Sequence, residues 1–275
     1  MITRLSGLLR RPLARPLRVP LVFAPRLVAT AAAPPPSPPP PAANERAEAD
    51  AEQAFEQALA QMDAGRVGDA IDGFASAARA GSAGANFFLG LAYDGLLGEN
   101  ALGEPHVEVD PSAAARCYQR AAEAGHAEAM LNLSLCFRNG EGVDRSARAA
   151  FQWTERGAAA GCERSMFNAG VALDPLHPPW GSPGAAEADL QPISKDGKRA
   201  AGYYRDAVDA GHAKAMVNLG ILLYTGTGVE KDAAAAAELW RAALEEGVQQ
   251  ADFCLKNMEE RPGELTNMFE NHQQS

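Results

Sequence analysis

The residues able to carry chemistry are few, and their spacing supports no reaction. No Cys-x-x-Cys pair occurs, and no histidine lies three or four residues from another histidine or from a cysteine. A dedicated zinc site therefore has no local support. The glycines at 140–142 and 226–228 lack the Lys-Ser or Lys-Thr that completes a phosphate loop, and no Gly-x-Ser-x-Gly or paired-carboxylate arrangement is present. The sequence predicts no catalytic residue, no cofactor and no metal site.

Two histidines and three methionines recur at fixed positions. His126 and His212 each follow an equivalent glycine, which favours a structural role at a helix start over catalysis. Met130, Met166 and Met216 share one later position and are interpreted as core residues. Recurrence of this kind indicates that the chain is built from repeats.

Five anchor glycines mark the repeat. Their spacings of 44, 36, 50 and 36 residues predict a unit of 36 with insertions of 8 and 14. Alanine stands eleven residues before each anchor, and mostly apolar residues at three, four, seven and eight before it complete one face of a helix that ends at the glycine. The anchors are Gly81, Gly125, Gly161, Gly211 and Gly247, and the residues seven before them are Phe74, Tyr118, Thr154, Tyr204 and Trp240.

A second helix is predicted after each anchor. A leucine or alanine lies eight residues on, followed in four units by a small residue that would let two helix backbones approach closely. These small residues are Gly90, Ser134, Gly170 and Gly220. Gly-x-Gly-Val loops at 140–143 and 226–229 then break the helix, and their valines can return to the core. Each unit is thus an antiparallel helix pair that must stack on its neighbours.

The pattern A-x-x-x-Y-x-x-A-A-x-x-G-H-A-x-A-x-x-N-L-G followed by G-x-G-V resembles the Sel-1-like repeat, most closely at 114–143 and 200–229. The resemblance implies an all-α, right-handed α/α superhelical solenoid of Sel-1-like, tetratricopeptide-like helix pairs. It also implies a non-catalytic protein-binding adaptor in complex assembly or quality control. A structural accessory subunit of a large organellar complex is the alternative, and a hydrolase is a further one that the residues do not support.

Some proteins of this family carry a disulfide in every repeat. Here Cys117, Cys136, Cys162 and Cys254 fall at unrelated repeat positions, which favours reduced, mostly buried thiols. One disulfide between Cys117 and Cys136 remains an alternative.

The first 44 residues hold six arginines and no acidic residue, which is typical of an organellar transit peptide. We expect a mitochondrial protein, with the matrix favoured; another organelle, the secretory pathway or an untargeted basic tail are alternatives. A proline-rich linker at 34–41 follows, and the longest apolar run in residues 1–44 is too short to span a membrane.

Without residues 1–44, the chain has 19 basic and 35 acidic side chains, which gives a formal charge of −16. Nucleic acid is therefore a poor candidate partner.

We expect one solenoid over 45–261, with a cap helix at 45–62 and about five units, and a tail at 262–275. Phe55, Leu59 and Met62 form the apolar face of the cap helix. Insertions enlarge the loops at 96–109 and 174–196, and the second carries Trp180 among prolines. Such a loop often belongs to a binding face, although Trp180 packed on an adjacent helix is an equal alternative.

The first helices of tetratricopeptide-like solenoids line the concave side. Opposite the apolar stripe they carry Arg116, Gln119, Arg120, Gln152, Arg156, Arg205 and Arg241. These side chains, with Trp180, are the predicted partner-binding residues, because guanidinium groups bind carboxylates of an acidic or C-terminal segment bidentately. The alternative is a solvated face on which Glu155, Asp206 and Glu238 pair with the arginines. The partner itself is not identified by the sequence.

Overall fold

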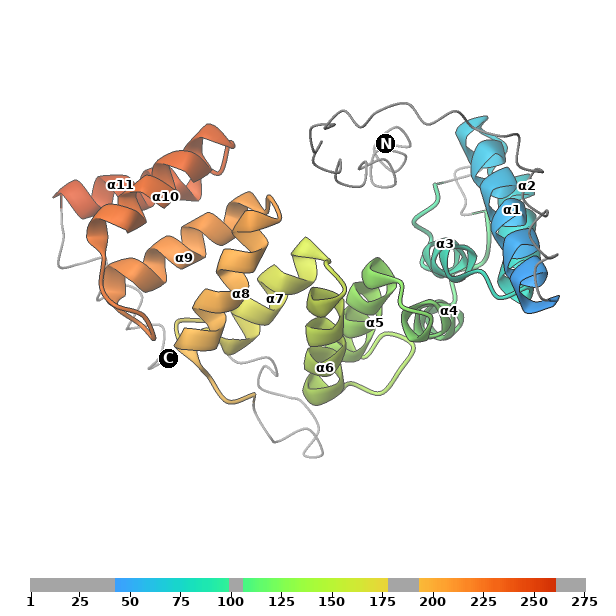
Figure 1. Ribbon diagram of the computed structural model, residues 1–275, viewed down its shortest axis with the longest axis horizontal. Helices are drawn as coiled ribbons and strands as arrows, with labels where there is room; N and C mark the ends of the chain where they lie inside the picture. Colours follow the sequence, from blue (N-terminus) through green and yellow to red (C-terminus); the bar gives the residue numbers. More distant parts are fainter. Residues whose placement is uncertain (1–42, 99–105, 178–192, 261–275) are drawn as a thin grey trace, which may run out of the picture. The chain divides into compact units, whose positions relative to one another are not determined.

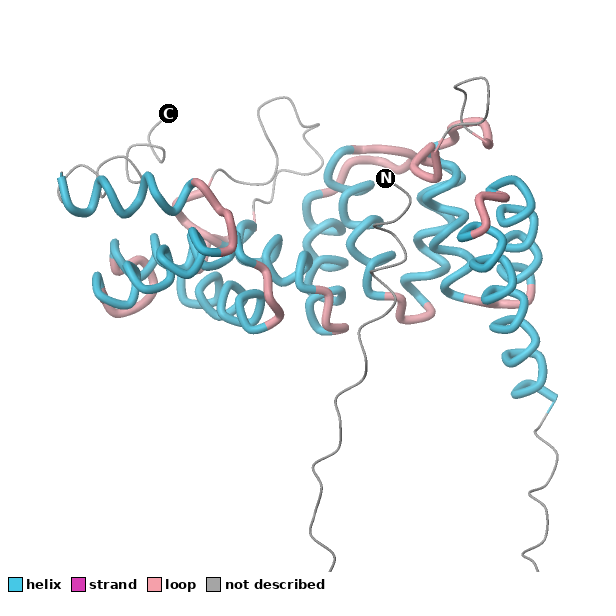
Figure 2. The backbone as a smooth tube through the Cα atoms, turned by 90° about the horizontal axis from the view of Figure 1, so that it is seen from above, coloured by secondary structure: helices cyan, strands magenta, loops and turns pink. Residues whose placement is uncertain are grey.

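The computed structural model describes residues 43–98, 106–177 and 193–260, and every regular element within these ranges is an α-helix (Figure 1). Figure 2 shows these helices joined by loops. The chain divides into two compact units, residues 1–81 and 82–275, and each is described by itself. The predicted all-α solenoid of helix pairs is confirmed; the single domain over 45–261 stays a prediction.

The first unit contains helices α1 (Ala43–Asp63) and α2 (Val67–Arg79), which pack against each other. The predicted helix at 45–62 is confirmed, and Phe55 and Met62 are buried on its apolar face, whereas Leu59 is only half-buried. The ring of Phe55 lies 5.8 Å, centroid to centroid, from that of Phe74 on α2. This aromatic contact forms the centre of the hairpin.

The second unit is a chain of helices in which each packs against the next. They are α3 (Ala83–Tyr93), α4 (Pro111–Glu123), α5 (Ala127–Asn139), α6 (Ala147–Ala159), α7 (Glu163–Leu173), α8 (Gly197–Asp209), α9 (Ala213–Thr225), α10 (Ala233–Glu245) and α11 (Gln250–Glu260). The even-numbered helices are the predicted first helices of the units, and the odd-numbered ones are the second helices.

The anchor glycines end the first helices as expected. Gly125, Gly161 and Gly211 have φ values of 92°, 89° and 92°, in the left-handed region that glycine adopts without strain. The backbone N–H of the residue after the anchor donates to a carbonyl in the last turn, as His126 does to Ala121 at 3.0 Å. This Schellman-type ending turns the chain back into the second helix.

The small residues of the second helices have a different purpose from the one predicted. A Cβ on Gly90, Gly170 or Gly220 would lie within 2.5 Å of the ring of Tyr118, Tyr204 or Trp240, respectively. An aromatic side chain of the following first helix, rather than a helix backbone, therefore occupies the space. All three aromatic residues are 0% exposed, which confirms the predicted core position seven residues before each anchor.

The four loops that lead from a second helix to the next first helix close at the same place, whatever their length. A backbone N–H just before the first helix donates to the carbonyl twelve residues after the preceding anchor glycine. The four pairs are Asp110 to Tyr93 (3.0 Å), Ser146 to Phe137 (2.8 Å), Asp196 to Leu173 (2.8 Å) and Asp232 to Leu223 (2.8 Å). The donating residue also caps the helix with its side chain; Asp110 Oδ1, for example, accepts from the N–H of Ala113 at 2.9 Å.

The two short Gly-x-Gly-Val loops lie against the start of the first helix of their own unit. A Cβ on Gly142 would be 2.0 Å from the carbonyl oxygen of Pro111, and one on Gly228 would be 2.2 Å from the carbonyl carbon of Gly197. Only glycine fits so close to another backbone, and both have a φ of 71°. The valine that follows is half-buried in both loops, and Val229 packs on the core.

Candidate partner-binding surface

The predicted arginine and glutamine positions are exposed on the first helices α4, α6, α8 and α10. On α4, the guanidinium of Arg116 is 4.0 Å from a carboxylate oxygen of Asp110, and Gln119 donates to Glu123 at 2.8 Å. Arg116 and Gln119 thus pair with acidic residues of their own helix or its cap. This agrees with the alternative in which these side chains form a solvated face. Trp180 lies outside the described residues.

On α6, the guanidinium carbon of Arg156 lies 4.6 Å from the ring centroid of Trp153. This cation–π contact holds Arg156 against its own helix. Glu155, which was expected to pair with neighbouring arginines of the predicted face, instead contacts α8: its Oε1 accepts from Arg199 at 2.6 Å and from the hydroxyl of Tyr203 at 3.2 Å. The first helices α6 and α8 are therefore bridged by polar side chains.

Between α8 and α10 the surface is hollowed instead. The cavity, named here the α8–α10 groove, has a volume of about 520 Å³ and a floor formed by Leu219 and Leu223 of α9. Val208 and Leu239 add apolar walls. Charged residues at the edge are Arg205, Asp209 and Glu238. Arg205, one of the predicted binding residues, thus borders an apolar groove between two first helices.

Arg241 lies one repeat after Arg205 in the same register and borders a second cavity. This cavity has a volume of about 590 Å³ and lies between α10, the end of α9 and Met258 of α11. Glu238 borders both cavities. The structure therefore brings two of the predicted arginines to adjoining hollows at α10.

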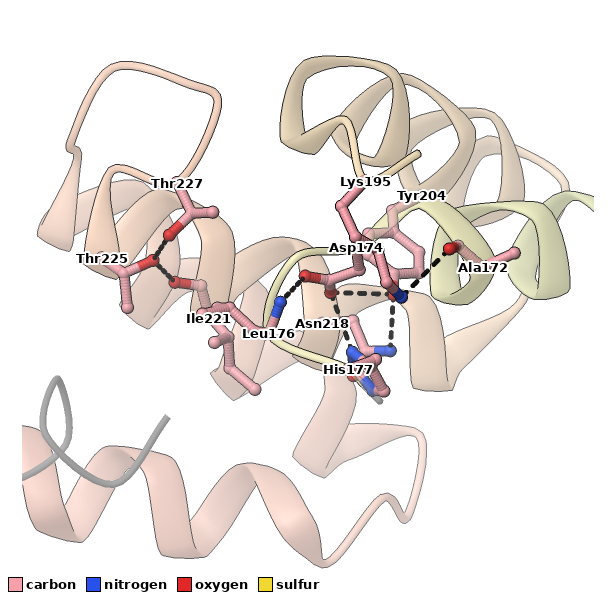
Figure 3. A network of polar contacts seen from close by, with 10 residues as sticks. All are labelled: Ala172, Asp174, Leu176, His177, Lys195, Tyr204, Asn218, Ile221, Thr225 and Thr227. Atoms are coloured by element: carbon pink, nitrogen blue, oxygen red, sulfur yellow. Dashed lines mark hydrogen bonds and ion pairs between the residues drawn. The ribbon is translucent and has the colours of Figure 1, made fainter. Parts of the chain in front are cut away.

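A polar network centred on Asp174 lies at the base of the second insertion (Figure 3). The carboxylate of Asp174 is 1% exposed and accepts from the backbone N–H of Leu176 at 2.8 Å and from the hydroxyl of Tyr204 at 3.0 Å. The Nδ1 of His177 lies 3.0 Å from the same carboxylate. Lys195, in the loop just before α8, donates to the carbonyl of Ala172 at 3.1 Å.

This network anchors the loop and does not form a nucleophile. Burial and the nearby Asp174 carboxylate raise the pKa of Tyr204, so its hydroxyl keeps its proton and donates it to Asp174. Asn218 in turn donates to the Tyr204 oxygen at 3.2 Å. Burial lowers the pKa of Lys195 from its ordinary value. The arrangement satisfies a buried carboxylate with several donors, which is what a buried charge requires.

Sequence reasoning missed this tyrosine–aspartate pair, although it occurs twice. Tyr118 donates to Asp94 at 2.6 Å in the unit that carries the first insertion. Asp94 and Asp174 both stand thirteen residues after an anchor glycine, in the two units with long loops. The pair could have been predicted from the sequence, because each aspartate at that position is accompanied by a tyrosine seven residues before the next anchor glycine.

The two recurring histidines stand at the N-terminal caps of α5 and α9, and each packs on an aromatic ring. The ring of His126 stacks on Phe87 with centroids 4.5 Å apart, and its Nδ1 accepts from the N–H of Ala129 at 3.2 Å. His212 stacks on Phe167 at 4.4 Å. Burial lowers the pKa of both imidazoles, so the neutral form is favoured.

The four cysteines are all buried and unbonded to one another. Burial raises the pKa of Cys136 to about 12 and that of Cys254 to about 11. Thiols of this kind remain protonated near neutral pH and are poor nucleophiles.

Within the described ranges no group of three or more His, Cys, Asp and Glu side chains is placed to hold a metal. No helix in that part of the chain combines the length and apolar composition needed to cross a membrane.

Comparison with known proteins identifies the repeat. The family model described as Sel1 repeat matches residues 83–126, 127–162, 187–212 and 213–248, which is more than half of the sequence. The chain belongs to the Sel1 repeat family. The matched segments 83–126, 127–162 and 213–248 each hold a second helix and the following first helix, such as α9 with α10, and the packing of Trp240 on Gly220 joins such a pair.

Solved structures show the same fold. A Sel1 repeat protein from Oxalobacter formigenes is 23% identical, with a TM-score of 0.61 and 74% of each chain covered. The protein c5321, described as a protective antigen of uropathogenic Escherichia coli with an SLR fold, is 22% identical with a TM-score of 0.61; the match covers 85% of this chain but 49% of that one. No curated protein matches the chain. The fold supports a protein-binding scaffold.

Proposed function

We propose that this protein is a non-catalytic scaffold that holds protein partners along its first helices, and that it acts in complex assembly or quality control inside mitochondria. The family supports protein binding. The arginine-rich, acid-free N-terminal sequence is what suggests the organelle. The absence of catalysis and the exclusion of nucleic acid stay predictions from the sequence.

The observation that carries the proposal is the α8–α10 groove. Its leucine floor offers apolar area to a bound segment, and Arg205 at its edge can donate two parallel hydrogen bonds to a carboxylate. Such a groove fits a peptide segment that carries an apolar side chain next to an acidic group. In the proposed complex, Leu219 and Leu223 contact the apolar side chain while Arg205 pairs with the acid.

Native co-purification of the tagged full chain from mitochondria, at low and high salt, tests this function. The substitution Arg205→Glu reverses the charge of the arginine at the groove edge and should remove most of the captured partner. The control Lys198→Glu makes the same charge change elsewhere on α8 and should leave capture unchanged. Equal capture by both variants would overturn the role of the groove.

The stoichiometry of the captured proteins separates the scaffold from the accessory subunit. An adaptor gives a salt-sensitive, substoichiometric set of partners, because charged contacts at an exposed edge are screened by salt. A fixed, salt-resistant ratio to one complex would instead identify a structural subunit. Capture from another compartment alone would contradict the mitochondrial part of the proposal.

A further inference from the structure

The junctions between successive first helices carry different side chains at the same repeat positions. At the α6–α8 junction, Glu155 of α6 accepts from the guanidinium of Arg199 and from the hydroxyl of Tyr203, both on α8. These residues stand six, twelve and eight residues before their anchor glycines. An acid, a base and an aromatic ring of the protein itself therefore meet across this junction.

At the α8–α10 junction the same three positions hold Arg205, Ala235 and Leu239, and all of them line the α8–α10 groove. The register of the two junctions is the same, because the backbone N–H of Ala235 and that of Arg199 each donate to the capping aspartate three residues earlier. A base thus replaces the acid, a methyl group replaces a guanidinium, and an isobutyl group replaces a phenol ring. The α8–α10 groove is the space that a ring and a long polar side chain occupy one junction earlier.

The charges at the edge of the groove define the polar part of an occupant. Within the described residues, Arg205 forms no ion pair with Asp209 or Glu238, the two acidic residues at that edge. One carboxylate from a bound segment would pair with Arg205 as Glu155 pairs with Arg199. A run of acidic residues would instead be repelled by Asp209 and Glu238. The edge therefore favours a single acidic group that lies toward α8.

The apolar part of the occupant is indicated by the ring that α10 does not supply. The residue eight before the anchor glycine is Trp153 in α6 and Tyr203 in α8, and both residues are half-buried. In α10 the same position is Leu239, and the groove of about 520 Å³ lies beside it over Leu219 and Leu223. A bound aromatic side chain restores the ring at this position, and it offers a large contact area with few rotamers to lose.

We propose that the α8–α10 groove binds a partner segment in which an aromatic side chain stands next to a single acidic residue. The ring packs on Leu219 and Leu223, at the place that Tyr203 has in the preceding junction, and the carboxylate pairs with Arg205. The inference rests on the proposed function, to which it adds the residue types that the partner must present.

Binding of the tagged full-length protein to an array of immobilised peptides tests these residue types. Each peptide of about eleven residues has a glycine–serine background, with Tyr or Leu at the centre and Glu or Gln at one of the two positions on either side. The best Tyr–Glu peptide should bind several-fold more protein than its Leu–Glu and Tyr–Gln counterparts. Equal binding to the Tyr and Leu peptides, or no binding above the background peptide, would overturn the proposal.

A variant that closes the groove from within provides the second test. The double substitution Ala235→Glu, Leu239→Tyr supplies the acid and the ring from α10 itself, and an acid in the first turn of a helix is favoured by the helix dipole. This variant should lose most of the array signal and melt close to the native temperature, because both positions are only half-buried. The control Ala234→Glu adds the same charge one residue away, outside the groove lining, and should keep the native signal. A full array signal from the folded double variant would place the peptides elsewhere and contradict the inference.

The co-purification experiment separates a failure of this inference from a failure of the proposed function. Loss of captured partners in Arg205→Glu, together with an array that prefers Leu–Glu peptides, would retain the groove as the binding surface and reject the aromatic occupant. Undiminished capture by Arg205→Glu would reject the groove as the binding surface, and the inference with it.

Discussion

The helix pairs α7–α8 and α9–α10 have the same architecture but are stabilised differently. In both, an aromatic ring of the first helix rests on a glycine of the second helix before it. Tyr204 of α8 then donates to the buried Asp174, whereas Trp240 of α10 donates to the backbone carbonyl of Val217 at 3.1 Å. In α7–α8, which carries the long insertion, the acceptor is therefore the ionisable carboxylate of Asp174. In α9–α10 the acceptor is a backbone carbonyl, which cannot ionise.

Their outer surfaces differ as well. Glu155 links α6 to α8 through Arg199 and Tyr203, while α8 and α10 are separated by the α8–α10 groove. Both pairs thus share the packing of an aromatic ring on a glycine in the interior, whereas the side chains between successive first helices differ. In the proposed function, the capture of a partner therefore depends on the side chains at these junctions.

The largest expected effect is on the aromatic contact of α9–α10. Trp240→Ala empties a fully buried site and should lower the free energy of unfolding by about 3–5 kcal/mol. Chemical denaturation measures the loss, and Trp240→Phe, which keeps a ring on Gly220, should lose less. A loss of the size seen for surface substitutions would show that this pair does not depend on its aromatic residue.

The polar anchor of α7–α8 comes next. Asp174→Ala leaves the Tyr204 hydroxyl and the Leu176 N–H without their acceptor and should cost about 1–3 kcal/mol. Asp94→Ala, at the equivalent place in the first insertion, should behave alike through Tyr118. Should Asp174→Ala unfold at the same denaturant concentration as the native protein, the anchor would not contribute to stability.

Acid should weaken the contact between the two pairs. Phe167 of α7 stacks on His212 at the start of α9, and burial depresses the pKa of that imidazole below its ordinary value of 6.5. A depressed folded-state pKa gives stability that is complete above 6.5 and is lost as the pH falls towards the folded-state pKa. Denaturation at a series of pH values should show this decline, and His212→Asn should reduce its slope. A steeper decline in His212→Asn would contradict the assignment.

The smallest effect is expected at the bridge between α6 and α8. The Arg199 side chain is exposed and that of Glu155 is partly exposed, so water screens the pair and Glu155→Gln should cost only about 0.2–1 kcal/mol. A double-mutant cycle with Arg199→Gln isolates the pair. A coupling energy well above this range would mean that the bridge, and not only the core, sets the spacing of the first helices.

Repeat length and core positions could be predicted because they depend on local periodicity. Anchor glycines, the buried residue seven before each and the Gly-x-Gly-Val loops all follow from backbone conformation and helical spacing. Contacts between units were not visible in this way: the position of Tyr204 over Gly170, or of Arg199 beside Glu155, depends on how successive helices pack. The α8–α10 groove escaped prediction for the same reason, since its floor and walls come from three helices.

Because the same backbone hydrogen bond closes each of these loops, the next first helix begins at the same place whatever the length of the loop. Asp110 and Asp196 return to the same repeat position as Ser146 and Asp232, although their loops are longer. Chain inserted between Asp94 and Asp110, or between Asp174 and Asp196, therefore does not alter the stacking frame. These two sites are natural insertion points for protein engineering, where a foreign peptide or a small reporter domain could be displayed without shifting the register of the repeats.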